Sequence, residues 1–85
     1  MRKNINIIGV GRRMSGVGKN SGANYDFTPV SFTYEDQRTS GLKAATCNVN
    51  QADMPYGYAP SVGETVEAVI REDYKTGRVY IDAIL

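Results

Sequence analysis

The sequence predicts an all-β fold: one small, partly open barrel of five strands with a protruding basic hairpin arm. Two observations predict the strands. Apolar and polar residues alternate along most of the chain, which is the two-residue period of a strand. Glycine, proline, asparagine and aspartate gather between these stretches, where turns need them. The 85 residues allow one domain, residues 1–85, with a core so small that oligomerisation is expected.

The first predicted strand covers residues 3–10 and the second residues 23–34. Four glycines within residues 11–22 favour a long projecting arm over a helix, because each would weaken a helix interior. Pro29 lies inside the second strand and cannot donate to a strand ladder. It therefore predicts an edge or a bulge at which the two faces of the strand could exchange.

The third predicted strand covers residues 42–49, and an irregular segment follows it. In that segment Tyr56 and Tyr58 are expected to pack onto the barrel or onto a neighbouring subunit. The fourth and fifth strands cover residues 65–71 and 78–85 and flank a hairpin tip. Five strands at this spacing are typical of barrels of either the oligonucleotide-binding or the SH3-like type.

The net charge of +1 hides an uneven distribution of charge along the chain. The first 25 residues contain five cations and no carboxylate, whereas the other 60 contain five cations and nine carboxylates, a balance of −4. Cations on a pliable arm beside aromatic rings suit a ligand with a charged backbone and stackable bases. The sequence therefore predicts binding of single-stranded nucleic acid. A solvated loop of incidental charge is the alternative, but it leaves the absence of acids unexplained.

The rare residue types argue against several other classes of function. Histidine is absent and Cys47 is the only cysteine, so the usual zinc, copper and haem ligands and an activated nucleophile are missing. We expect a protein that is not an enzyme and that holds no cofactor or metal, with Cys47 as a small buried hydrophobe. No disulfide, secretory segment or apolar run of about 20 residues is present, so a soluble protein of a reducing cytoplasm is expected.

The aromatic residues divide by strand face. Phe32 shares its face with Val30 and is expected in the core, whereas the face of Tyr25 and Phe27 also carries serine and threonine. Tyr74 lies in a charged turn, where burial within its own subunit is not expected. Exposed rings at these positions would stack on bases.

Four short motifs follow one another along the chain: the basic arm before Tyr25-Asp26-Phe27, then Tyr34-Glu35-Asp36, Pro55 with Tyr58-Ala59-Pro60, and Ile81-Asp82 in the final hairpin. This ordered set resembles a known family, the filamentous-phage (inovirus) single-stranded DNA-binding, or helix-destabilising, proteins. The resemblance implies a five-stranded oligonucleotide-binding barrel that forms a two-fold homodimer. It also implies cooperative coating of phage DNA during replication and before packaging, in the cytoplasm of a bacterial host.

The same resemblance assigns roles to individual residues. It implies phosphate contacts for Arg12 and Arg13, with Lys19 near the return of the arm, and a stacking surface for Tyr25 and Phe27. Tyr34 and Tyr74 match two further aromatic positions, the second beside the partner subunit's site. The family's basic residue of the third strand has its nearest counterpart in Lys43. The arginines of its last strand are replaced by Ala83 and Leu85, so Arg78 or Lys75 is expected to take over that contribution.

Two other functions stay open at this point. An SH3-like module could use its exposed tyrosines and the region of Pro60 to bind a peptide or sister subunits. An RNA-binding or primosome-type barrel would also bind nucleic acid, but nucleic acid of another kind.

Overall fold

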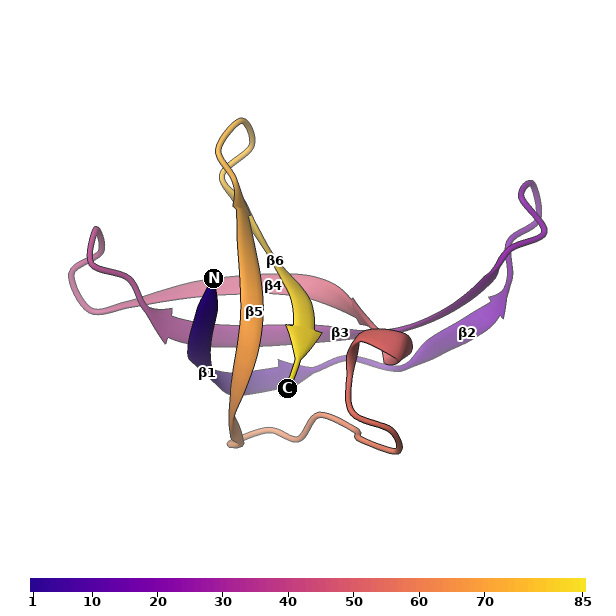
Figure 1. The fold of residues 1–85 in the computed structure, drawn as a ribbon, viewed down its shortest axis with the longest axis horizontal. Coiled ribbons are helices and arrows are strands. Elements are labelled where there is room, and N and C mark those ends of the chain that lie inside the picture. Colours follow the sequence, from indigo (N-terminus) through magenta and orange to yellow (C-terminus); the bar gives the residue numbers. More distant parts are fainter.

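The chain forms six strands and one short 3₁₀ turn in the computed structural model, which describes residues 1–85 (Figure 1). All pairs of neighbouring strands are antiparallel, so the all-β prediction is confirmed. The five predicted strands are all present, with ends that differ by one or two residues. The elements are β1 (Arg2–Val10), β2 (Met14–Val17), β3 (Asn24–Glu35), β4 (Leu42–Asn50), η1 (Gln51–Asp53), β5 (Thr65–Asp73) and β6 (Arg78–Ile84).

The prediction of five strands is wrong by one, because the arm contains a strand of its own. β2 pairs with the first four residues of β3, so the arm is a hairpin that extends away from the rest of the sheet (Figure 1). Gly16 lies opposite Tyr25 in this pair. A Cβ atom at Gly16 would lie 2.8 Å from the Tyr25 hydroxyl oxygen, so the tyrosine side chain lies across the glycine. This glycine makes room for a ring.

The predicted barrel is not closed. The sheet runs in the order β2-β3-β1-β5-β6, and β4 pairs with the other edge of β3. β4 and β6 approach one another, but no ladder of backbone hydrogen bonds joins them. At this seam the Ile81 backbone N–H donates to Cys47 Sγ at 3.3 Å. A side chain therefore takes the place of a backbone partner, and the sheet stays open.

The hydrophobic core lies within the curved sheet and takes one face of each long strand. On β3, the residues Thr28, Val30, Phe32 and Tyr34 are all buried. Ile5 and Ile7 of β1 lie against this row in the same core, and Cys47 is buried as predicted. Desolvation by this burial raises the pKa of the Cys47 thiol.

Pro29 lies at a local edge of β3, in the gap between the pairing with β1 and the pairing with β2, but the predicted exchange of faces does not occur. The pairing of β3 with β4 continues without a break from Phe27 to Glu35. The Pro29 carbonyl accepts the Gly11 N–H at 2.8 Å, just beyond the end of β1. Because the N and C=O of one strand residue face the same neighbour, the missing donor of Pro29 faces the gap between β1 and β2. The irregularity in the sheet lies instead in β1, between Ile7 and Gly9.

The segment between η1 and β5 is irregular, as predicted. Met54 is buried and Tyr58 is half-buried against the core, so the packing role expected for Tyr58 is confirmed. The Tyr58 hydroxyl donates to Glu64, and desolvation together with this carboxylate raises the pKa of Tyr58. Tyr56 is fully exposed, so its expected packing onto the barrel is wrong, while its packing onto a neighbouring subunit stays a prediction. No helix in the structure has the length and apolarity that a membrane crossing requires.

Candidate nucleic-acid interface

Two aromatic rings lie side by side at the base of the arm. The ring centroids of Tyr25 and Phe27 are 6.0 Å apart, and the ring planes are inclined by 39°. Both residues lie on the face of β3 that is opposite the core, and Tyr25 is 41% exposed. Across the hairpin, Met14 pairs with Phe27 and adds an exposed thioether beside the rings. This outer face therefore offers flat, accessible apolar surface.

From these rings as far as Thr33 of β3 and Ala44 of β4, the outer face of the sheet carries no charged side chain, and Glu35 follows only at the far end of β3. Ser31 of β3 lies opposite Thr46 of β4, and their hydroxyl oxygens are 2.9 Å apart. Small neutral side chains do not repel a polyanion, and their hydroxyls and amides can hydrogen-bond to it. The other residues of this strip are Pro29 and Thr33 of β3 and Ala44, Asn48 and Asn50 of β4.

Arg13 also lies at the base of the arm, but a carboxylate holds it. Its Nε donates to Asp26 Oδ1 at 2.7 Å, and its Nη2 donates to Asp26 Oδ2 at 2.6 Å. These hydrogen bonds lower the pKa of Asp26 and raise that of Arg13. Both side chains are largely solvent-exposed. Arg13 therefore lies on the arm, but it forms an ion pair with Asp26 that the sequence did not predict.

The other two cations of the arm have no such partner. Arg12 and Lys19 are exposed and form no ion pair. Lys19 lies in the turn at the tip, where the Gly18 N–H donates to the Ala23 carbonyl at 2.8 Å and closes the hairpin. The arm thus presents one unpaired cation at its base and another at its tip.

A cleft of about 920 Å³ opens between the base of the arm and the segment that follows β4. Arg13, Tyr25 and Asp26 line it on one side, and residues 50–54 with Tyr56 and Gly57 line it on the other. The fully exposed Tyr56 adds a second tyrosine to this cleft. Sequence reasoning missed Tyr56 as a site residue. Its position in a Pro-Tyr-Gly turn, where Gly57 has a φ of +75°, is the signal that indicates an exposed tip.

Two predicted contact residues are not available to a ligand. Tyr34 is 2% exposed and its ring stacks on Phe32 at a centroid distance of 5.8 Å, so its predicted stacking on bases is wrong for this structure. Alternation along β3 places it on the core face with Phe32. Lys43 Nζ lies 3.2 Å from Glu72 Oε1 and 3.8 Å from Asp36 Oδ2. Its hydrogen bond to Glu72 raises the pKa of Lys43, so this ammonium serves an internal ion network.

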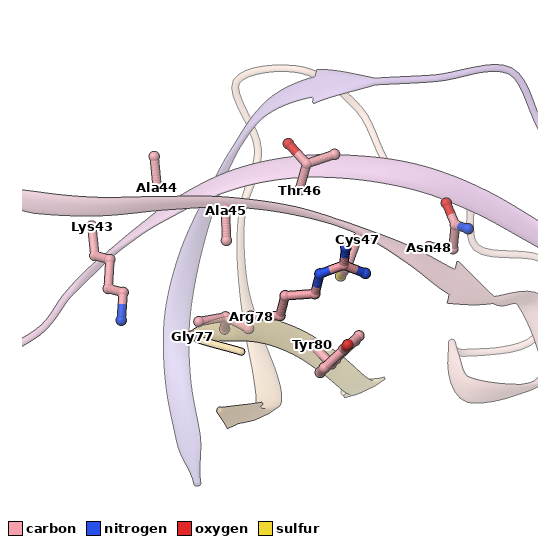
Figure 2. Close-up of a pocket in the computed structure, with 10 residues that line it drawn as sticks. Lys43, Ala44, Ala45, Thr46, Cys47, Asn48, Gly77, Arg78 and Tyr80 are labelled. Atoms are coloured by element: carbon pink, nitrogen blue, oxygen red, sulfur yellow. The ribbon is translucent and has the colours of Figure 1, made fainter. Parts of the chain in front are cut away.

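Tyr74 and Arg78 are exposed, but they lie on the β5–β6 hairpin, which projects from the sheet well away from the arm (Figure 1). Within one chain the fold does not bring them to Tyr25 and Phe27. Arg78 forms no ion pair and extends from β6 into the gap toward β4 (Figure 2). Together with Lys43 it lines a cavity of about 490 Å³ at the open seam of the sheet.

The structure contains no cluster of three or more histidine, cysteine or acidic side chains that could hold a metal ion. Comparisons with protein-family models, with curated proteins and with solved structures find no match to this chain. The functional argument therefore depends on the geometry of the arm and the sheet.

Proposed function

We propose that this chain binds single-stranded DNA cooperatively and without strong sequence preference, through the base of the arm and the outer face of β3 and β4. The observation that carries the proposal is the adjacent ring pair of exposed Tyr25 and half-buried Phe27, next to the acid-free stretch of the arm that holds Arg12. Large exposed rings on a strand need a partner, and bases supply one.

In this proposal the rings and the cations contribute separately. Tyr25 and Phe27 stack on bases without choosing among them, because every base has a π-face, and each stack contributes about 1–3 kcal/mol. Arg12 and Lys19 contact phosphates and release counterions. Each phosphate contact makes the slope of log affinity against log salt more negative by about 0.7 on single strands.

The same geometry favours single strands over duplex. In a duplex the faces of the bases are stacked on one another, so rings on a sheet cannot reach them without unstacking. A single strand can lay its bases on Tyr25 and Phe27 while its backbone follows the arm. The neutral strip across β3 and β4 extends this surface by several residues without adding a repelling charge.

The proposed fold is a partly open oligonucleotide-binding barrel built from β1, β3, β4, β5 and β6, with the seam between β4 and β6 as its opening. The proposed assembly is a homodimer in which Tyr74 of one chain works beside the arm of the other. Contacts between dimers along the strand would supply the cooperativity. The resemblance to filamentous-phage DNA-binding proteins supports a role in coating phage DNA during replication and before packaging, inside the bacterial host.

Intrinsic tyrosine fluorescence tests the proposal, because the chain contains six tyrosines and no tryptophan. Titration with poly-dT at several salt concentrations should quench the fluorescence, and affinity should fall steeply as salt increases. Matched duplex and RNA oligomers serve as comparisons. A flat response to salt, or equal affinity for duplex, would contradict the proposal. Tighter binding to RNA than to DNA would assign the chain to RNA instead.

A protein-interaction module is the second candidate, and the number of exposed apolar side chains favours it. Ile8 and Val62 are each more than half exposed, outside the proposed DNA surface. This module leaves the unpaired cations of the arm without a role. Retention on heparin with no preference for nucleic acid, and no tyrosine quenching by poly-dT, would favour this second function.

A further inference from the structure

We propose that Asp26 is a built-in competitor for Arg13, which holds the guanidinium in the free protein and has to be displaced when DNA binds. In this role Asp26 lowers both the affinity for single strands and its dependence on salt. The inference rests on the proposed function, since it concerns how the same surface takes up a phosphate.

The geometry of the pair supports the competition. Both guanidinium donors that bind Asp26 lie within 2.7 Å of a carboxylate oxygen, one to each oxygen. A phosphate presents two oxygens to arginine in the same forked arrangement. The same donors cannot serve both anions at once. Arg13 must therefore leave Asp26 before it can bind a phosphate in this mode.

The location of the pair places the competition in the proposed DNA path. Alternation along β3 places the Asp26 side chain on the face opposite to Tyr25 and Phe27. At the base of the arm, however, Arg13, Tyr25 and Asp26 all line the same cleft. Asp26 is also the first carboxylate of the chain, after 25 residues that contain five cations. A phosphate that enters this cleft from the side of Tyr25 therefore meets Arg13 and its carboxylate together.

The pair is weak enough to be displaced by a polyanion. Both partners are solvent-exposed, at 58% for the Arg13 side chain and 37% for Asp26, and exposed ion pairs contribute little to stability. Arg38 offers a contrast, because two carboxylates, Asp36 and Glu72, bind it at once. A single carboxylate can hold Arg13 in the free protein and still yield to phosphate.

The salt dependence separates a competitor from a residue that only positions Arg13. An unpaired arginine that binds a phosphate releases a counterion, which adds about 0.7 to the magnitude of the salt slope. When Arg13 moves from Asp26 to a phosphate, the phosphate releases a cation, but the freed Asp26 carboxylate beside the DNA takes one up, so the net release and its effect on the slope are close to zero. Removal of the Asp26 charge should restore this contribution.

The central experiment compares the wild-type chain with Asp26→Asn in titrations with a dT oligomer between low and moderate salt. We expect Asp26→Asn to bind about two- to fivefold more tightly at low salt, in line with the modest coupling of exposed ion pairs. We also expect its salt slope to be steeper by about 0.7. Circular dichroism should show unchanged folding, since the pair is exposed.

Asp53→Asn is the matched control. Asp53 lines the same cleft and carries the same charge, but its partner is the neutral Asn50 amide, 3.3 Å away. Its replacement should increase affinity less than Asp26→Asn does and should leave the slope unchanged. Equal effects of the two variants would show that Asp26 acts only through its negative charge and not by binding Arg13, and this would overturn the inference.

A double-mutant cycle with Arg13→Gln completes the test. In the Arg13→Gln background, Asp26→Asn should gain no more than Asp53→Asn, because there is no arginine left to release. Weaker binding by Asp26→Asn in the wild-type background would show that Asp26 positions Arg13 productively, and would overturn the inference alone. A wild-type chain that binds no dT oligomer at any salt would overturn the proposed function and this inference with it.

Discussion

The two ends of β3 carry similar residue types in opposite states. At the arm end, Tyr25 is exposed and Arg12 has no ion-pair partner. At the far end, Tyr34 is buried, and Lys43 and Arg38 are bound by carboxylates. Residue type alone would rank both ends as binding surfaces.

The difference between the ends has two physical sources. The alternation of side chains along β3 determines which tyrosine is buried. Tyr34 lies on the core face with Val30 and Phe32, and Tyr25 lies on the other face. Nearby carboxylates decide whether a cation is paired: Asp36 binds Arg38 within the same turn, and Glu72 of β5 binds both Arg38 and Lys43. Cations make an anion-binding surface only where carboxylates have not already neutralised them.

The largest expected effect is on stability, at the buried end of β3. Tyr34→Ala should lower the free energy of unfolding by about 3–5 kcal/mol, because it leaves a large cavity beside Phe32. Thermal unfolding followed by circular dichroism measures this. Tyr34→Phe, which keeps the ring, is the control. A Tyr34→Ala chain of normal stability would show that the ring is not part of the core.

The exposed end should respond in binding and not in stability. Tyr25→Ala should weaken binding to poly-dT by about 1–3 kcal/mol, because one base stack is lost, with little change in salt slope. Fluorescence anisotropy of a labelled dT oligomer measures both. If Tyr25→Ala instead binds normally and unfolds at a lower temperature, the ring belongs to the packing of the arm against Gly16.

A smaller effect distinguishes the cations of the two ends. Arg12→Ala should weaken binding similarly for all sequences and reduce the magnitude of the salt slope by about 0.7. Arg38→Ala is the matched control and should leave the slope unchanged, because Arg38 is held by Asp36 and Glu72. Equal slope changes in the two variants would remove the distinction between paired and unpaired cations.

The smallest expected effect is on the pH dependence of stability. Hydrogen bonds from Arg38 hold the pKa values of Asp36 and Glu72 below the ordinary carboxyl range. Their contribution to stability is therefore present above about pH 4 and is lost as pH falls through the lower folded values. The melting temperature should fall on acidification, and less so in Glu72→Gln. An identical acid response of that variant would show that Glu72 contributes nothing.

Much of the fold could be predicted because its signals are local. Alternation of apolar and polar residues placed five strands within one or two residues of their observed ends, and the face of Phe32 followed from the same pattern. β2 escaped prediction because Gly16 and Gly18 weaken the strand signal, while its pairing partner lies across the arm. Whether the sheet closes could not be predicted either, because closure depends on hydrogen bonding between β4 and β6, which are distant in the sequence.

The candidate site could be predicted only in part. Tyr25 and Phe27 lie on the outer face, as their polar neighbours Ser31 and Thr33 indicated, with Tyr25 exposed and Phe27 half-buried. Tyr34 was placed on the interface by resemblance, against the alternation that assigns it to the core. The pairing of Lys43 could not be foreseen, because its partner Glu72 lies 29 residues away in the sequence. Tyr56 lies opposite Tyr25 only because the segment after β4 folds back beside the arm.

The sequence by itself determined the strands, their inner and outer faces, and the concentration of cations without acids in the first 25 residues. These properties follow from the period of the strand and from the order of residues along the chain. Only the tertiary structure decided which cations remain unpaired, which tyrosines stay exposed, and that the sheet remains open at Cys47. The reason is physical: ion pairs, burial and strand pairing mostly join residues that are distant in sequence, and a local sequence pattern contains no information about such contacts.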